Sequence, residues 1–356
     1  MKKITLYFIS SSLILGAFYN HARVDDKNFV QPNSLIKKIL YADVVLDDPL
    51  IIDLVESQAF KRLAQVRQYG IDPLVLPMAP QAIDYNRYNH CLGVYWLCRI
   101  YGAPFNEQVA ALLHDASHTT FSHVGDYLFE HKDGKNSYQD DHHLEFLNET
   151  DIPAILNKYG LKLSDIDHKN SAFLCLENSL PEICADRLEY NLTGGIIEGL
   201  ITRAEACEIL KNLKFEGDRW YFICVDQAKK FAYIPLWHTL YRWGCPSSAY
   251  VSEIFVLALR RALELSLITL QEIKHGADDD VWYRLVNSSD SQIVAWMKQI
   301  FDAHTHADDL NKGQRTNKFR GVDPWVQVEE KFFRLTALDQ EFKDAYDCVQ
   351  HILGAG

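Results

Sequence analysis

Over most of the chain beyond residue 34, apolar residues recur at the three- and four-residue spacing of amphipathic helices. A helix with one apolar face must bury that face against other elements, so this pattern predicts a mainly α-helical globular fold. Apolar residues make up 48% of the 356 residues, which is enough for a packed core in one large domain or two.

Three helices near the centre of the chain are predicted from their end signals: residues 86–101, ended by Gly102 and Pro104; Asn106 to about His118; and a helix opened by the capping-box pattern Ser179-Leu-Pro-Glu182 and closed by Gly194-Gly195. Phe215 to Cys224, with Gly217-Asp218 at its centre, predicts a short β-hairpin and is the one clear strand signal. Residues 226–300 return to helical periodicity, 302–320 read as a loop, and a last segment covers 325–351. The expected fold class is all-α, with a short β-hairpin near 215–224 and a helical C-terminal extension.

The amino terminus bears on compartment. Lys2 and Lys3 precede an uncharged, mostly apolar run, Ile4 to Phe18, which is similar to the core of a signal peptide and is too short for a comfortable transmembrane span. Segment 1–22 is therefore expected to be a signal peptide of a periplasmic or extracellular protein, with no transmembrane anchor. An ordinary apolar N-terminal segment of a cytoplasmic protein stays open as the alternative, and residues 24–34 read as a polar arm.

Charge and cysteine usage narrow the partners. The net charge of −12 argues against sequence-independent nucleic-acid binding, because that binding depends on Lys and Arg neutralising phosphates. A small anion can still bind where a few basic groups or a metal ion are concentrated. The eight cysteines show no CxxC pair and look like scattered thiols; disulfides stay open if the protein is exported, as does the oligomeric state, a homo-oligomer included.

Histidines cluster in one part of the chain, with seven of the fourteen lying between residues 90 and 143. On a helical wheel His90 and Arg87 fall on the apolar face of the first central helix, so both are expected to point inward. A buried arginine side chain destabilises the folded state unless an anionic group lies beside it. The alternative is a core histidine beside an arginine in a structural salt bridge.

In the second helix, His114, Asp115 and His118 lie opposite the apolar residues, and the two histidines are one turn apart. A neutral imidazole nitrogen beside a carboxylate oxygen suits a divalent metal ion. His123 and Asp126 follow a short turn and add two more polar groups. A solvated polar helix face is the alternative, but the concentration of histidines favours a metal site.

Asp186 and Tyr190 lie on the polar side of the third helix, where geometry alone gives a surface residue. Their nomination comes from a resemblance. In order, Arg87-Tyr-Asn-His90-Cys-Leu-Gly, then Ala110-Ala-Leu-Leu-His114-Asp115-Ala-Ser-His118-Thr-Thr-Phe-Ser-His123, then Cys184-Ala-Asp186-Arg187-Leu-Glu-Tyr190 resemble the HD-domain metal-dependent phosphohydrolases, nearest to the deoxynucleotide triphosphohydrolase branch. The resemblance spans residues 60–193.

The resemblance implies an HD-domain helical fold over residues 23–200 and a mostly helical accessory region over 201–356. It implies a divalent ion, whether iron, manganese, zinc or magnesium, held by His90, His114, Asp115 and Asp186. It also implies a small phosphorylated substrate and hydrolysis of a phosphate ester, with a nucleotide or deoxynucleotide as one candidate. The implied catalytic residues are His118, His123 and Asp126, one of the histidines being the general acid, and the implied phosphate contacts are Arg87, His143, Arg187 and Tyr190.

Three departures from the family pattern bear on the substrate. The turn after the His-Asp pair has Ser117, Thr119 and Thr120 where the family has glycines and a proline, and Thr193-Gly194 replaces a common Arg-Asp pair. His142-His143 stands where the family has His-Glu, so either histidine could align. These departures affect substrate handling more than the metal ligands. One alternative function is therefore a nucleotide-binding regulatory protein that keeps the fold and metal without turnover, and another is an interaction module in which residues 226–356 bind a partner through an exposed aromatic patch.

Overall fold

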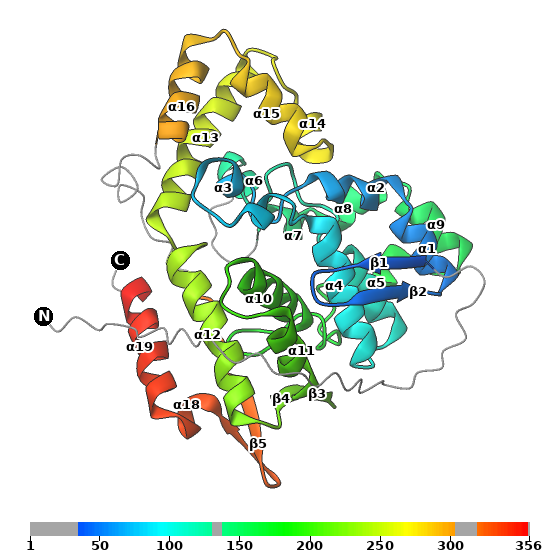
Figure 1. Ribbon diagram of the computed structural model, residues 1–356. Coiled ribbons are helices and arrows are strands. Elements are labelled where there is room, and N and C mark those ends of the chain that lie inside the picture. Colours follow the sequence, from blue (N-terminus) through cyan, green and yellow to red (C-terminus); the bar gives the residue numbers. More distant parts are fainter. Residues whose placement is uncertain (1–34, 130–136, 303–318, 355–356) are drawn as a thin grey trace, which may run out of the picture.

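A computed structural model describes residues 35–129, 137–302 and 319–354 of the chain (Figure 1). The predicted signal peptide and polar arm, and most of the predicted loop at 302–320, lie outside the described residues. Among the described residues, no helix is both long enough and apolar enough to cross a bilayer.

Helices dominate the described residues, as the apolar periodicity predicts. The α-helices are α1 Pro49–Val55, α2 Gln58–Arg62, α3 Asp72–Val75, α4 Arg87–Ile100, α5 Phe105–Leu113, α6 Val124–Leu128, α7 Tyr138–Asp141, α8 His143–Asn148, α9 Ile152–Lys158, α10 Ala185–Ile197, α11 Arg203–Lys211, α12 Val225–Tyr241, α13 Pro246–Glu264, α14 Leu270–His275, α15 Asp278–Val286, α16 Ser291–Asp302, α18 Leu335–Leu338 and α19 Gln340–Gly354. Three short 3₁₀ helices are Leu63–Gln65, Pro80–Ile83 and Leu163–Asp165.

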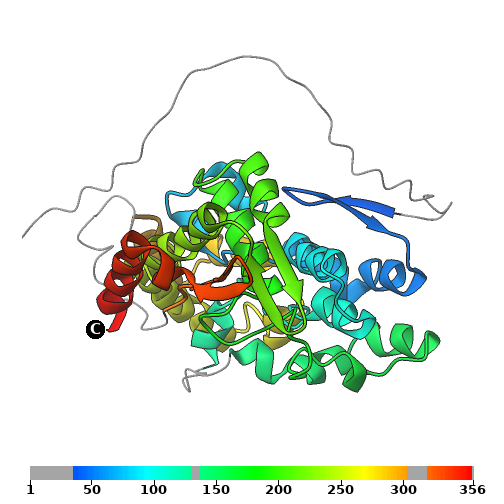
Figure 2. The same cartoon turned by 90° about the horizontal axis from the view of Figure 1, so that it is seen from below.

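Two small sheets correct the all-α expectation. Strands β1 Leu35–Lys38 and β2 Asp43–Leu46 form an antiparallel hairpin, which Figure 2 shows beside the helices rather than between them. The predicted hairpin is confirmed as β3 Leu213–Glu216 and β4 Arg219–Phe222, joined through Gly217 at φ +66°.

The hairpin belongs to a larger sheet that the sequence pattern did not show. Its strand order is β3-β4-β5-β6, with β5 Trp325–Val328 parallel to β4 and β6 Lys331–Arg334 antiparallel to β5. Strands of four residues are too short for a clear two-residue alternation, and β5 finds its partner about a hundred residues away in sequence.

The first predicted central helix is confirmed, but the second is shorter than expected. The Asn86 side chain caps α4, accepting a hydrogen bond from the Asn89 N–H at 3.0 Å. Helix α5 ends at Leu113, not near His118. The Arg62 guanidinium donates to the carbonyl oxygens of Ala116 at 3.0 Å and His118 at 2.6 Å, and these external bonds replace those of a continuing helix.

The third helix also differs from its prediction at both ends. Helix α10 begins at Ala185, whose N–H donates to the Cys175 carbonyl at 2.8 Å, and not after the capping-box pattern at Ser179. It continues through Gly194-Gly195 to Ile197. A Cβ atom at Gly194 would lie 2.7 Å from both the His238 ring and the Tyr69 hydroxyl, so this glycine serves close packing, not helix termination.

Two large hydrophobic cores, besides a small cluster of Ala82, Tyr85 and Ile197, organise the part of the chain that the structure describes. The larger one packs α4, α5 and α10 against α12 and α19, and it runs across the predicted domain boundary at residue 200. The second lies within α13–α16, at the top of Figure 1, and includes Phe121 and Val124 from the segment that follows α5. The C-terminal helices therefore pack directly on the polypeptide that carries the histidine cluster. The division at residue 200 stays a prediction.

Candidate metal centre

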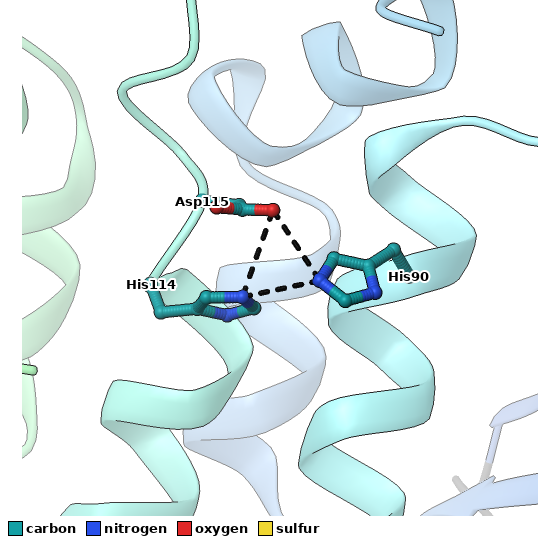
Figure 3. A group of neighbouring side chains, drawn as sticks. All are labelled: His90, His114 and Asp115. Carbon is teal, nitrogen blue, oxygen red and sulfur yellow. Dashed lines mark hydrogen bonds and ion pairs between the residues drawn. The ribbon is translucent and has the colours of Figure 1, made fainter. Parts of the chain in front are cut away.

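Three helices bring four predicted ligands together. His90 lies on α4, His114 and Asp115 directly follow α5, and Asp186 lies in the first turn of α10. The two Nε2 atoms of His90 and His114 are 3.2 Å apart, and Asp115 Oδ2 lies 3.4 Å and 3.6 Å from them. Figure 3 shows these three side chains facing one another. Asp186 Oδ1 closes the group at 2.9 Å from His90 Nε2 and 3.5 Å from His114 Nε2.

These spacings fit a divalent ion. Ligand bonds of about 2.1 Å place neighbouring donor atoms about 3.0 Å apart in octahedral geometry and about 3.4 Å apart in tetrahedral geometry. The His114 Nδ1 atom lies 2.8 Å from the Ala111 carbonyl oxygen, which can only accept, so the Nε2 atom carries the lone pair. Two imidazole nitrogens and two carboxylates form a mixed donor set, so the residues fit a metal of borderline or hard character.

The electrostatics at His90 favour a positive charge. Complete burial by itself lowers the pKa of the imidazole, but the carboxylates of Glu189 and Asp186 outweigh burial and raise it to about 10. Burial by itself raises the pKa of Asp115, but the positive charges of Arg87 and the neighbouring histidines outweigh burial and hold this pKa well below its usual range. Carboxylates that stay ionised while buried provide the negative potential that a cation needs.

Glu189 completes the centre and was missed by the sequence reasoning. Its side chain is 1% exposed, and its Oε2 atom lies 2.5 Å from His90 Nδ1 and accepts a hydrogen bond from the Tyr85 hydroxyl at 2.6 Å. Thr193 donates to the other oxygen at 2.6 Å. A carboxylate on the far nitrogen of a ligating histidine fixes the tautomer and the ring orientation. The available signal was a glutamate beside Leu188 and Leu192 on the apolar side of the third helix.

Arg87 is buried, as its place on the apolar face predicts, and it pairs with a candidate ligand. Its Nη1 atom lies 2.5 Å from Asp115 Oδ2, and its Nε–H donates to the Ser122 hydroxyl at 3.0 Å. The Arg87–Asp115 pair is a buried salt bridge, as the structural alternative for Arg87 predicted, and it also involves a candidate metal ligand.

The two histidines of the following turn differ in exposure. His118 is buried, with Nε2 3.2 Å from Asp115 Oδ1, and burial followed by the charge of Arg87 lowers its pKa to about 4. His123 has an exposed side chain whose Nδ1 lies 3.1 Å from Asp126 Oδ2, and its ring centroid is 5.1 Å from that of His118. The one-turn spacing of His114 and His118 had no helical basis, since α5 ends before both.

The structure separates the two candidates at 142 and 143. His142 is exposed and pairs with Glu145 at 2.9 Å. His143 is 1% exposed, and its Nδ1 lies 2.9 Å from the hydroxyl of Ser117, two residues after Asp115. Its Nε2 atom is buried and has no hydrogen-bond partner among the described residues. His143 is therefore the residue beside the centre, with a free ring nitrogen.

Arg187 and Tyr190 have other partners. The Arg187 guanidinium donates to the carbonyls of Glu182 at 2.6 Å and Asn178 at 3.1 Å, contacts that secure the loop before α10. The half-buried Tyr190 ring lies 5.4 Å from the Trp243 ring and 6.5 Å from the His90 ring. The structure thus places Tyr190 at the edge of the centre, and Arg187 in a loop contact.

In a comparison with known protein families, residues 87–167 of the chain match the model of the HD domain. The matched segment holds His90, His114 and Asp115. Among its relatives is the uncharacterized protein YdhJ of Bacillus subtilis, 27% identical over 86% of this chain and 93% of that protein. The metal-dependent phosphohydrolase cns2 of Cordyceps militaris is 32% identical over 56% of this chain and 54% of that protein.

Two further proteins are similar to this chain. The deoxynucleoside triphosphate triphosphohydrolase SAMHD1 of Danio rerio is 31% identical over 23% of this chain and 15% of that protein. A phosphohydrolase of Bacteroides thetaiotaomicron has a similar structure, with a TM-score of 0.62, 15% sequence identity, and coverage of 86% of this chain and 94% of that one. The latter likeness extends the shared fold well beyond residues 87–167.

Proposed function

We propose that the protein is a metal-dependent phosphohydrolase that cleaves a small phosphate ester. One observation carries the proposal: the Nε2 atoms of His90 and His114 lie 3.2 Å apart, and Asp115 and Asp186 each place an oxygen 2.9–3.6 Å from both. Glu189 and the Ala111 carbonyl engage the far nitrogens of the two histidines. Buried carboxylates need a positive charge beside them, which a divalent ion supplies when it binds between the histidines. The names of two relatives, a metal-dependent phosphohydrolase and a deoxynucleoside triphosphate triphosphohydrolase, support the same chemistry.

A bound metal ion and four residues of the chain would each have a role in the reaction. A divalent ion bound there would polarise a phosphoryl oxygen and make a water molecule more acidic. Arg87, held between Asp115 and Ser122, would offer positive charge to the phosphate. His143 would donate to or accept from a substrate oxygen through its unpartnered Nε2 atom. Tyr190 would flank the substrate, and Arg187 would keep the loop before α10 in place.

We assign the proton donor to His123 in preference to His118. The leaving oxygen must be protonated, and a histidine with a carboxylate partner and access to solvent can exchange protons during turnover. His123 has Asp126 as that partner. His118 is buried, its pKa is lowered to about 4, and it contacts Asp115, so it is better suited to orient that carboxylate.

Nucleotides and deoxynucleotides are the first substrates to test, because the SAMHD1 relatives are named for deoxynucleoside triphosphates. If segment 1–22 directs export, extracytoplasmic nucleotides or other phosphoesters become the natural candidates. The alternative function is a nucleotide-binding regulatory protein without turnover. Its distinguishing result is tight nucleotide binding in calorimetry with no phosphate release.

The test combines elemental analysis with a phosphate-release screen. Protein purified without chelator is assayed for bound iron, manganese, zinc and magnesium, and then against deoxynucleotides, nucleotides and simple phosphoesters. Asp115→Asn keeps the side-chain volume and should lose both metal and activity, whereas Glu145→Gln, on an exposed histidine pair, should keep both. An Asp115→Asn protein that keeps both its metal and full phosphate release would refute the assignment.

A further inference from the structure

The turn that follows the His-Asp pair has a strained backbone. Phe121 and Ser122 both adopt left-handed conformations, with φ 58° and 54°, although neither is glycine. A bulky residue such as phenylalanine adopts this conformation only where the surrounding structure imposes it. The turn carries Ser122, which contacts Arg87, so what imposes its shape bears on the candidate site.

Asp278, the first residue of α15, holds this turn. It is 0% exposed, and its Oδ1 atom accepts a hydrogen bond from the Phe121 N–H at 2.7 Å. Its Oδ2 atom accepts from the Arg67 N–H at 2.9 Å, with the Arg67 guanidinium 3.6 Å away. A second bond from the same region reaches the turn, since the Thr120 N–H donates to the Ile273 carbonyl at 2.9 Å.

A continuous series of contacts leads from Asp278 to the candidate metal ligand. The Ser122 hydroxyl donates to the Arg67 carbonyl at 2.6 Å, and so its lone pair is turned to the Arg87 Nε–H at 3.0 Å. Arg87 in turn pairs with Asp115 at 2.5 Å. Asp278 fixes the backbone of both Arg67 and Phe121, the two segments that determine where the Ser122 hydroxyl lies.

The turn is also confined from its other side. Gly70 has φ +58°, and a Cβ atom there would lie 2.6 Å from the Phe121 carbonyl oxygen. The backbones at Gly70 and Phe121 are therefore in close contact, which leaves the turn little room to shift toward residues 67–70.

We propose that Asp278 is a positioning residue for the candidate metal centre, acting through the 119–123 turn and Arg87. The inference rests on the proposed function, and it gives a role to the C-terminal helical region, in which the sequence shows no cluster suggestive of chemistry. Asp278 contacts Arg67 and the Phe121 backbone, not the four candidate ligands. It sets the hydroxyl that orients Arg87, which in turn faces Asp115.

The test compares Asp278→Asn with Asp279→Asn. Both variants lose one carboxylate in the first turn of α15, but Asp279 is exposed and contacts only the outer Arg67 nitrogen at 2.7 Å. Asp278→Asn is expected to lower kcat/KM about ten- to hundredfold, as loss of outer-shell support does elsewhere, with metal content unchanged. Asp279→Asn should stay within about twofold of the parent protein, because its contact lies away from the turn.

A double-mutant cycle separates positioning from general destabilisation. If Asp278 acts through Arg87, the double variant Asp278→Asn/Arg87→Ala has the same kcat/KM as Arg87→Ala alone. Full additivity of the two losses, or a fully active Asp278→Asn, would overturn the proposal. Should Asp278→Asn fail to fold, Ser122→Ala replaces it in the same cycle with the same expectations, since it removes only the hydroxyl link.

A readout without turnover distinguishes this proposal from the proposed function. If the parent protein releases phosphate from no substrate, the proposed function fails, and amide hydrogen exchange decides about Asp278. The proposal that Asp278 holds the turn is supported if the 119–123 amides exchange at least tenfold faster in Asp278→Asn than in Asp279→Asn while the amides of α10 exchange at an unchanged rate. Equal exchange in the two variants overturns it.

Discussion

Glu189 provides the sharpest test of the metal centre, because its replacement by glutamine removes charge while keeping shape. The glutamine carbonyl can still accept from His90 and Tyr85, and its amide can face Thr193, whose hydroxyl then becomes the acceptor. Gly93 leaves no alternative space, since even a Cβ atom there would lie 2.6 Å from Glu189 Cγ. The substitution should therefore change the strength of the His90 contact more than its geometry.

The magnitude follows from the burial of the pair. His90 and Glu189 are 0% and 1% exposed, so water does not compensate for the lost charge. A hydrogen bond to a charged group contributes about 1.5–3 kcal/mol and a neutral one about 0.5–1.5 kcal/mol. The difference of roughly 1–2 kcal/mol corresponds to manganese binding about 5- to 30-fold weaker in Glu189→Gln.

Isothermal titration calorimetry of Mn²⁺ into chelator-treated protein measures this effect. Glu145→Gln is the matched control, because Glu145 also pairs with a histidine nitrogen, at 2.9 Å, but on the surface. The control should bind Mn²⁺ as the parent protein does. If Glu189→Gln also binds Mn²⁺ with the parent affinity while remaining folded, the histidine is not a ligand supported by Glu189, and the reasoning is refuted.

Three further predictions concern stability. Burial raises the pKa of Asp72 to about 6, although the hydrogen bond from the Ser248 hydroxyl lowers it. Protonation of Asp72 therefore stabilises the folded state, and this contribution is present below about pH 4 and lost as the pH rises through 6. Asp72→Asn should therefore gain up to about 3 kcal/mol relative to the parent protein between pH 4 and 7, measured by urea unfolding; parallel pH profiles would contradict this. Gly194→Ala should lower the free energy of unfolding by about 1–2 kcal/mol, because its Cβ atom would lie 2.7 Å from His238 and Tyr69, and the higher helix propensity of alanine offsets only part of this loss. An unchanged midpoint of urea unfolding would exclude that clash. Metal at a hundredfold excess over its Kd should stabilise by about 2.7 kcal/mol, so chelation should lower Tm and Mn²⁺ should restore it, with Asp115→Asn insensitive to both.

The sequence by itself determined the local features of this protein. Apolar periodicity was sufficient to predict a mainly helical fold, and Asn86 and Gly102 were sufficient to bound α4. Helical geometry alone correctly predicted that Arg87 and His90 point inward, since an amphipathic helix buries one face wherever it packs. The β3–β4 hairpin followed from its turn residues for the same reason: its partners are adjacent in sequence.

The role of Asp186 could not be predicted from its own helix. Its place on a helical wheel indicates a surface residue, and only resemblance to a family nominated it as a ligand. In the structure it is 2.9 Å from His90, because α10 packs against α4 at that point. The pairing of β4 with β5 and the end of α5 at Leu113 likewise depend on partners far away in sequence.

Tertiary structure alone decided which side chains support the centre. Glu189 contacts a histidine 99 residues earlier, and Asp278 contacts the backbone of a phenylalanine 157 residues earlier. The only sequence signal for Glu189 is its place on the apolar side of its helix, and Asp278 has none, because the donors that a buried carboxylate accepts from are known only once the chain is folded. The ligand types could be predicted from residue chemistry, whereas the groups that orient them depend on which helices come into contact when the chain folds.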